Sequence, residues 1–206
     1  KHAILDPNLC KSMPKSLSIS SGLDALSHAC EAIWNINHNP IVDEIAKVAI
    51  IKIKKYLPLV LNDPANIIYR KEMQMASVLA GIAMSKTKTA ICHSISYPLT
   101  AMFGVSHGIS CSLTLWAISR LSVERNADRA SIISQAMGCS NNNLEKNIIS
   151  FQKQLNYGKF IRPLRKAKID MSINFINPTR SKNSLVQISN KEAVKIVINS
   201  IKKFRK

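Results

Sequence analysis

Apolar residues recur every three or four positions in the stretch GLDALSHACEAIW (residues 22–34), and this spacing constrains the fold more than any other feature. Leu23, Leu26 and Ile33 would share one face of a helix that starts just after the serines at positions 20 and 21. Serine is a favoured helix N-cap because its hydroxyl accepts a hydrogen bond from a free backbone N–H group. We therefore expect a helix here with one face buried in a core.

Helical spacing of apolar residues continues through most of the sequence, and only residues 2–6 (HAILD) are typical of the end of a strand. Pro98 is expected to interrupt one helix, and Gly104 and Gly108 flank a predicted loop that carries His107. The sequence therefore predicts an all-α, multi-helix domain preceded by a residual strand. The other predicted helices are residues 40–55, 66–85, 88–96, 109–121, 144–156 and 191–204.

The chain of 206 residues is long enough for one substantial domain, and its 46% hydrophobic content fits a globular protein. It contains no run of eighteen apolar residues, so we expect no membrane partner, and its first residues do not resemble a secretion signal. Five cysteines are scattered without a C-x-x-C pair. This pattern favours reduced thiols and a cytoplasmic location.

Lysine and arginine outnumber aspartate and glutamate by 29 to 12, which gives a net charge of +17. One interpretation is binding to nucleic acid or another polyanion. The other is compositional drift that has removed carboxylates from the surface. Aromatic residues make up only 5% of the chain, so the stacking platforms of nucleic-acid-binding surfaces are not indicated, and we do not expect a nucleic-acid partner.

Four potential metal ligands stand out: Asp24 and His28, which are four residues apart, and the more distant His93 and His107. On a helix, side chains four residues apart project from one face about 6 Å apart. Each group alone has an ordinary explanation, namely a surface pair, a hydrogen-bonded interior histidine or an exposed loop histidine. In an apolar region, however, a shared divalent cation would satisfy all four groups, whose burial is otherwise costly. Such ligands suit Fe²⁺, Zn²⁺ or Ni²⁺ and leave the ion a Lewis acid.

Several ordered motifs make this sequence similar to the iron-containing (group III) alcohol dehydrogenases. They are DPNLCKSMP followed by SGLDALSHACEA, then NPIVDEIAKVAIIKIKKYLP, ASVLAGIAMS and HSISYPLTAMFGVSHG. The resemblance is close over residues 3–120 and looser to the end of the chain. It implies the helical metal-binding domain of the dehydroquinate synthase-like, iron-type alcohol dehydrogenase fold. The family's metal ligands fall on Asp24, His28, His93 and His107.

The resemblance also implies an activity. Members transfer hydride between the carbon of a small alcohol or aldehyde and NAD(P), while a divalent metal, expected to be Fe²⁺, polarises the oxygen. Full-length members are expected to be homo-oligomers.

Members also have an N-terminal α/β nucleotide-binding domain with a Gly-rich loop, and no G-x-G-x-x-G or G-G-G-S pattern occurs in this sequence. We therefore expect residues 1–14 to be the end of a nucleotide-binding domain that these 206 residues lack, and residues 15–206 to be the helical domain. NAD(P) would then bind only with that other domain, which a separate chain could supply.

The sequence departs from the family pattern at three places. Tyr97 stands where many members carry a histidine, and it either relays a proton or only packs at the pocket wall. Lys86, Lys88 and Thr89 replace small neutral residues and resemble the branch that includes phosphonoacetaldehyde reductases. Cationic and hydroxyl groups there would bind a phosphonate-bearing aldehyde. Ser106 replaces a proline and is expected to loosen the loop before His107.

The leading hypothesis is thus the metal-binding half of an NAD(P)-dependent iron-type alcohol dehydrogenase or aldehyde reductase. Three alternatives stay open at this point: a catalytically inactive metal-binding fragment, a relative of glycerol dehydrogenase or dehydroquinate synthase with other ligands, and a basic nucleic-acid-binding helical module.

Overall fold

The computed structural model describes residues 2–165, 168–170 and 173–205, and within these ranges the chain is helical and has no β-strand. A single antiparallel bridge joins Asn35 and Ser184. The α-helices are α1 (Lys15–Ile33), α2 (Pro40–Asn62), α3 (Ile67–Thr87), α4 (Ile91–Phe103), α5 (His107–Ser112), α6 (Leu115–Arg125), α7 (Ala127–Ala136), α8 (Leu144–Gln154), α9 (Pro178–Ser181) and α10 (Asn190–Phe204). The short 3₁₀ helices are η1 (Pro7–Cys10), η2 (Asn141–Asn143) and η3 (Tyr157–Lys159). The expected all-α class is confirmed.

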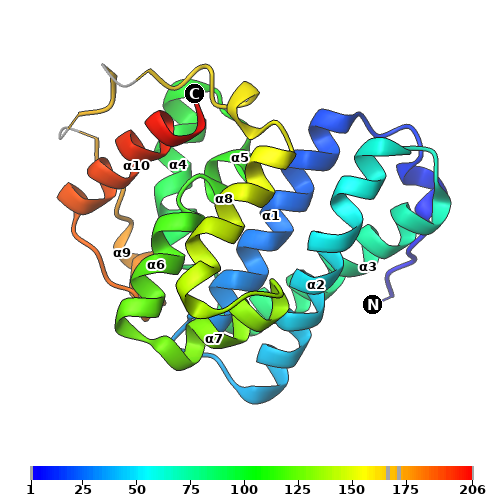
Figure 1. Cartoon of the computed structure of the whole chain (residues 1–206), viewed down its shortest axis with the longest axis horizontal. Helices are drawn as coiled ribbons and strands as arrows, with labels where there is room; N and C mark the ends of the chain where they lie inside the picture. The colour runs from blue at the N-terminus through cyan, green and yellow to red at the C-terminus, as the bar shows by residue number, and fades with distance from the viewer. Residues whose placement is uncertain (1, 166–167, 171–172, 206) are drawn as a thin grey trace.

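Helix α1 runs through the middle of the molecule (Figure 1). Helices α2 and α3 pack on one side of it and α4 and α5 on the other, whereas α7 packs against both α1 and α2. One continuous apolar core therefore extends from Ile19 to Phe204. Because α1 is covered on both sides, most of its length is buried, including polar residues such as Ser27 and Glu31.

The expected residual strand at residues 2–6 is wrong. These residues are irregular and lead into η1, where the Asp6 side chain accepts a hydrogen bond from the backbone N–H of Asn8 (2.9 Å). Ile4 is 94% exposed. A strand needs a neighbouring strand to satisfy its backbone groups, and the described residues provide none here.

Two predicted helix limits also differ from the structure. Helix α1 starts at Lys15, before Ser20 and Ser21, which were expected to cap it. Ser21 instead donates a hydrogen bond to the carbonyl one turn earlier, and Ser20 donates one to Ser106. Helix α4 continues through Pro98 to Phe103. Proline removes one backbone hydrogen bond from a helix, but burial of the apolar face of α4 offsets this loss.

The link between α3 and α4 is held by side-chain amides. Asn37, Asn35 and Asn183 donate hydrogen bonds to the successive carbonyls of residues 87, 88 and 89, at 3.4, 3.1 and 2.9 Å. Within this link, Lys88 has φ +67° and ψ 169°, a region that is otherwise almost confined to glycine. The surrounding contacts therefore fix a strained backbone immediately before α4.

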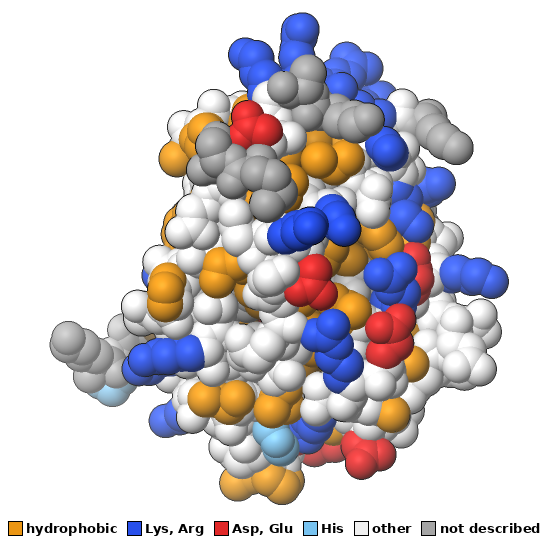
Figure 2. All heavy atoms as spheres, turned by 90° about the vertical axis from the view of Figure 1, so that its left-hand side faces the viewer, with side chains coloured by type: hydrophobic (Ala, Val, Ile, Leu, Met, Phe, Trp, Pro, Cys, Tyr) orange, Lys and Arg blue, Asp and Glu red, His pale blue; other side chains and the backbone are white. Residues whose placement is uncertain are grey.

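The charge excess shows on the surface. Lysine and arginine side chains outnumber acidic ones on the face seen in Figure 2 and gather at its upper end. No helix within the described residues combines the length and apolarity that a membrane crossing requires. All five cysteines are free thiols, and Cys30, Cys92 and Cys111 are buried.

Candidate metal centre

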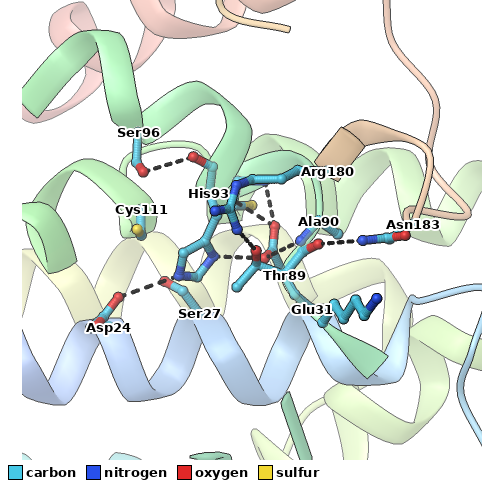
Figure 3. Close-up of polar contacts among 12 residues, drawn as sticks. Asp24, Ser27, Glu31, Thr89, Ala90, His93, Ser96, Cys111, Arg180 and Asn183 are labelled. Carbon is cyan, nitrogen blue, oxygen red and sulfur yellow. Dashed lines mark hydrogen bonds and ion pairs between the residues drawn. The ribbon is translucent and has the colours of Figure 1, made fainter. Parts of the chain in front are cut away.

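Four potential ligand atoms converge where α1, α4 and α5 meet. They belong to Asp24, His93, His107 and Cys111, and all lie within 4.8 Å of one another. Asp24 Oδ1 is 3.5 Å from His93 Nε2 and 3.8 Å from His107 Nε2. Figure 3 shows the side chains of Asp24, His93 and Cys111 pointing toward one another. The structure thus brings together three of the four predicted metal ligands and adds a thiol.

The packing of α5 on α1 positions two of these groups. His107 is the first residue of α5, not a loop residue, and Cys111 follows one turn later on the same face. Gly108 lies so close to α1 that an added Cβ atom would be 1.9 Å from the carbonyl oxygen of Ser20 and 2.8 Å from Cβ of Asp24. Glycine is therefore required next to His107, because it allows the backbone of α5 to touch α1.

Glu31 orients His93 from behind. Its carboxylate is fully buried, accepts a hydrogen bond from the backbone N–H of Ala90 (2.8 Å) and lies 2.7 Å from Nδ1 of His93. It also accepts from the N–H groups of Cys92 and His93 at the start of α4. Because Nδ1 of His93 donates to Glu31, its Nε2 faces Asp24. A carboxylate behind a ligating histidine is a common feature of metal sites.

The cluster contains two buried polar atoms that make no hydrogen bond. Asp24 Oδ1 and His93 Nε2 face each other at 3.5 Å, an ion-pair contact, and neither makes a hydrogen bond within the described part of the chain. Buried polar atoms without hydrogen bonds are costly, and a cation between these two would bind both. The residues present therefore fit a divalent metal ion.

The charges at the cluster reinforce this fit. Burial alone would raise the pKa of Asp24, but the neighbouring histidines lower it below its ordinary value, so the carboxylate stays ionised. Burial lowers the pKa of His107, which favours the neutral ring that a metal needs. Burial alone would also lower the pKa of His93, but Glu31 and Asp24 raise it well above its usual range. A metal ion must therefore displace a proton from His93.

His28, the fourth predicted ligand, lies beside this cluster rather than in it. Its imidazole stacks on that of His93, with ring centroids 4.6 Å apart and planes 14° from parallel. A metal–imidazole bond lies in the plane of the ring, so two rings stacked in parallel do not aim at one ion. Coordination by His28 stays a prediction, and it requires the ring to turn away from His93.

Tyr97 borders the cluster on its open side. Its ring centroid is 5.9 Å from that of His107, and the residue is 38% exposed. The guanidinium of Arg180, from α9, lies 4.7 Å from the centroid of the Tyr97 ring and donates a hydrogen bond to Oγ1 of Thr89 (2.5 Å). Arg180 is only partly buried, and no carboxylate among the described residues lies within ion-pairing distance of it. A cation therefore stands next to the candidate site with no acidic partner.

The structure separates the three residues expected to bind substrate. Thr89 is buried beneath Arg180, whereas Lys86 and Lys88 are exposed. Ser106, expected to loosen the segment before His107, accepts a hydrogen bond from the hydroxyl of Ser20 (3.1 Å). This contact ties the start of α5 to α1.

Comparison with known proteins decides the family. Residues 18–170 match the Fe-containing alcohol dehydrogenase family, C-terminal domain. The chain belongs to this family. The match begins within α1, continues past α8 and includes every residue of the cluster.

Relatives of this iron-type alcohol dehydrogenase domain include several dehydrogenases. It is 35% identical over 158 residues to an NADPH-dependent butanol dehydrogenase of Clostridium saccharobutylicum, a match that covers 75% of this chain and 40% of the relative. It is 32% identical over 136 residues to an NAD-dependent methanol dehydrogenase of Bacillus methanolicus, covering 66% and 36% of the two chains.

Solved structures agree with this assignment. The sulfoacetaldehyde reductase of Bifidobacterium kashiwanohense, solved with NAD⁺, is 30% identical, with a TM-score of 0.86 over 97% of this chain and 54% of that one. An iron-containing alcohol dehydrogenase of Thermotoga maritima is 25% identical, with a TM-score of 0.78 over 96% and 53%. The chain thus spans about half the length of these two solved structures, and 40% or less of the length of the two curated relatives. Membership of the phosphonoacetaldehyde reductase branch stays a prediction.

Three candidate functional residues were not expected from the sequence: Cys111, Glu31 and Arg180. A signal existed for the first two, because Cys111 is four residues after His107 and Glu31 is seven residues after Asp24 on the same helix face. Nothing in the sequence marked Arg180, which reaches the site through tertiary packing of α9 on α4.

Proposed function

We propose that this domain is the metal-binding half of an NAD(P)-dependent alcohol dehydrogenase or aldehyde reductase, acting together with a nucleotide-binding half. The observation that carries the proposal is the convergence of Asp24, His93 and His107, in which two buried ligand atoms make no hydrogen bond. The names of the relatives, which include butanol and methanol dehydrogenases, support the reaction class. NAD(P) would be bound mainly by the other half, and the metal expected from the family is Fe²⁺, with Zn²⁺ or Ni²⁺ as alternatives.

A divalent ion bound at this cluster would supply Lewis-acid chemistry, polarising the alcohol or carbonyl oxygen while hydride moves between carbon and nicotinamide. Asp24 and His93 would hold it from the buried side, and Glu31 keeps Nε2 of His93 turned toward it. His107 is 41% exposed and lies on the side from which substrate would approach. The ring of Tyr97 lies beside that of His107 and the residue is partly exposed, so its hydroxyl is the group that would donate or relay a proton.

The substrate class that fits this site best is an aldehyde that carries an anionic group. Arg180 offers a guanidinium on the rim of the site, stacked on Tyr97 and bonded to Thr89. Guanidinium groups bind sulfonates and phosphonates through paired hydrogen bonds. The similarity to a sulfoacetaldehyde reductase supports this substrate class. Arg180 and Thr89 would bind the anion directly, and the exposed Lys86 and Lys88 would add long-range attraction.

The test is a chimera of residues 1–206 with the part of the B. kashiwanohense sulfoacetaldehyde reductase that this domain does not match. We expect the metal-loaded chimera to oxidise NADH or NADPH in the presence of an aldehyde, and an Asp24→Asn variant to lose at least 100-fold of this activity, about 2.7 kcal/mol in transition-state stabilisation. A folded chimera that binds metal but reduces none of sulfoacetaldehyde, phosphonoacetaldehyde and butyraldehyde would contradict the proposal.

The substrate class is tested by Arg180→Met, which keeps the length of the side chain and removes its charge. We expect KM to rise about 10- to 100-fold for the two anionic aldehydes, which corresponds to a lost charged hydrogen bond, and to stay unchanged for butyraldehyde. Equal effects on all three aldehydes would show that Arg180 supports the fold and not the recognition of an anion.

A further inference from the structure

We propose that a hollow between the ends of α8 and α10 binds a small molecule that carries a chain of phosphate groups, such as a di- or triphosphate. This hollow, called the basic hollow below, has a volume of about 570 Å³, which is an ordinary size for a small-molecule site. None of the residues that line it belongs to the metal cluster, so the inference does not depend on the proposed function.

The charged side chains of the basic hollow are all positive. Lys153, Lys159, Arg162 and Arg205 line it, and no aspartate or glutamate does. All four are exposed, and none forms an ion pair with a carboxylate in the part of the chain that the structure describes. In Figure 1 the C-terminus and the end of α8 lie at the upper end of the molecule, and lysine and arginine gather at this same end in Figure 2. The hollow therefore concentrates positive charge that no described carboxylate neutralises.

The ends of two helices explain only part of this charge. Helix α8 ends at Gln154 and α10 at Phe204, and basic residues are favoured there because the last carbonyl groups of a helix are partly negative. Each helix end is equivalent to about half a negative charge, so two ends offset roughly one of the four positive charges. A net charge of about three remains for a ligand.

The floor of the basic hollow is fixed by buried contacts. The hydroxyl of Tyr157 donates a hydrogen bond to the carbonyl of Ile109 (2.5 Å) and accepts one from Ser112 (3.2 Å), and the residue is fully buried. Gly158 lies so close to the end of α10 that an added Cβ atom would be 2.2 Å from the carbonyl oxygen of Phe204. These contacts hold η3 against both α5 and α10. A ligand would therefore meet a preformed floor, which lowers the entropic cost of binding.

Two guanidinium groups are available to bind phosphate oxygens. Nη2 of Arg205 donates to the carbonyl of Arg162 (2.5 Å), which anchors this side chain at the rim of the hollow. A guanidinium has five N–H groups, so most of those of Arg205 stay available. The guanidinium of Arg162 donates no hydrogen bond to any described residue. Paired N–H groups match the oxygens of a phosphate, and the ammonium groups of the two lysines add point charges.

A chain of phosphates fits this hollow better than a single anion or a nucleic acid does. A net charge of about three exceeds that of one sulfate or phosphate group. Nucleic-acid surfaces present aromatic rings on which bases stack, but the two aromatic residues here, Tyr157 and Phe204, are buried. A di- or triphosphate carries its charges on adjacent groups, so one hollow can receive all of them.

The experiment is a calorimetric titration of the whole 206-residue chain with inorganic tripolyphosphate at an ionic strength of about 0.15 M. The chain is kept free of metal, because polyphosphates themselves bind divalent ions. We expect one tripolyphosphate per chain. The double variant Lys159→Gln, Arg162→Gln should weaken binding about 5- to 20-fold, since two exposed charge contacts are lost. The double variant Lys11→Gln, Lys71→Gln removes the same charge from exposed positions outside the hollow and should change affinity less than twofold.

Adenosine triphosphate is the second probe, and it distinguishes two sources of the phosphate chain. Tighter binding than that of tripolyphosphate supports a nucleotide as the ligand, and equal binding supports a free polyphosphate. Thermal unfolding checks that each variant is folded, and Lys153→Gln replaces the first double variant if that one is not.

Four results would overturn the inference. They are no binding of tripolyphosphate, equal weakening in the two double variants, sulfate binding as tight as that of tripolyphosphate, and tighter binding of a single-stranded oligonucleotide than of either probe. Equal weakening would mean that net charge alone attracts the anion, and the last result would favour a nucleic acid. Because the titrations are done without metal, none of these results bears on the proposed metal site.

Discussion

At the scale of single residues, Glu31 determines what His93 can do. Its carboxylate lies against Nδ1 of His93 and accepts hydrogen bonds from backbone N–H groups at the start of α4. Glu31→Gln turns an amide NH₂ toward these donors, so we expect stability to fall by about 1–3 kcal/mol. Zinc affinity should fall about 10- to 100-fold because the ring is no longer oriented.

Urea unfolding and a zinc competition titration measure the two effects. Glu44→Gln, at an exposed carboxylate on α2, is the control and should change neither quantity. Unchanged zinc affinity in Glu31→Gln would show that Glu31 serves the fold alone.

The protonation of His93 makes metal binding depend on pH. The pKa of His93 is raised by Glu31 and Asp24, so without metal it carries a proton at neutral pH that an ion must displace. Affinity should therefore increase with pH, by up to about tenfold per pH unit for each proton released. Calorimetric zinc titrations in two buffers with different ionisation enthalpies count these protons. We expect at least one at pH 7, and none released would contradict the charge state of the cluster.

At this scale three of the four residues in the candidate cluster were expected from the sequence. Asp24, His93 and His107 are polar groups in apolar helices, and the expense of burying them pointed to a shared partner. Cys111 was harder to predict, because a cysteine is as often buried in an apolar core as a leucine, and only its spacing of four residues from His107 marks it. The position of His28 depends on a ring rotation that sequence spacing does not determine.

At the scale of helices, the contact of α5 with α1 sets the position of His107. Gly108→Ala would place a methyl group 1.9 Å from the carbonyl oxygen of Ser20, so the two helices must separate. We expect a loss of about 2–4 kcal/mol in stability and weaker metal binding, measured by thermal unfolding and zinc titration. Gly81→Ala, on α3 with no atom within 4 Å of the added group, is the matched control and should gain about 0.5–1 kcal/mol. Similar stability of the two variants would mean that α5 does not touch α1.

The strained link before α4 makes a second prediction at this scale. Lys88 has φ +67° and ψ 169°, a conformation that costs a non-glycine residue about 1–3 kcal/mol. Lys88→Gly should therefore raise the unfolding free energy by about 1 kcal/mol, after the greater flexibility of glycine in the unfolded chain is deducted. Lys88→Ala keeps the strain and isolates the loss of charge. Equal urea midpoints for these two variants would show that the backbone here is relaxed.

Helix existence was predictable and helix ends were less so. The expected helix at residues 191–204 agrees within one residue with α10, whose start is fixed by a capping box of Ser189 and Glu192. The predicted start of α1 and the predicted interruption of α4 at Pro98 were wrong. Tertiary burial, which a local sequence pattern does not report, outweighs a proline or a favoured cap. The expected strand at residues 2–6 failed for a related reason, since a strand depends on a partner elsewhere.

At the scale of the whole molecule, the helices on both sides of α1 form one core, and the candidate site lies where α1, α4 and α5 meet (Figure 1). The net charge of +17 is a property of the surface (Figure 2). A basic hollow lined by Lys153, Lys159, Arg162 and Arg205 contains Tyr157, but that ring is fully buried and cannot stack on a base. Family membership and the metal cluster therefore explain the molecule better than nucleic-acid binding does.

The most direct test of the account is the zinc content of the purified chain after dialysis against Zn²⁺ and then metal-free buffer. His107 is 41% exposed, so His107→Asn should remain folded while losing a ligand. The account predicts about one zinc ion per chain in the parent protein and in the control His2→Asn, and far less in His107→Asn with an unchanged metal-free unfolding curve. Zinc retained equally by His107→Asn, or absent from the parent protein, would contradict it.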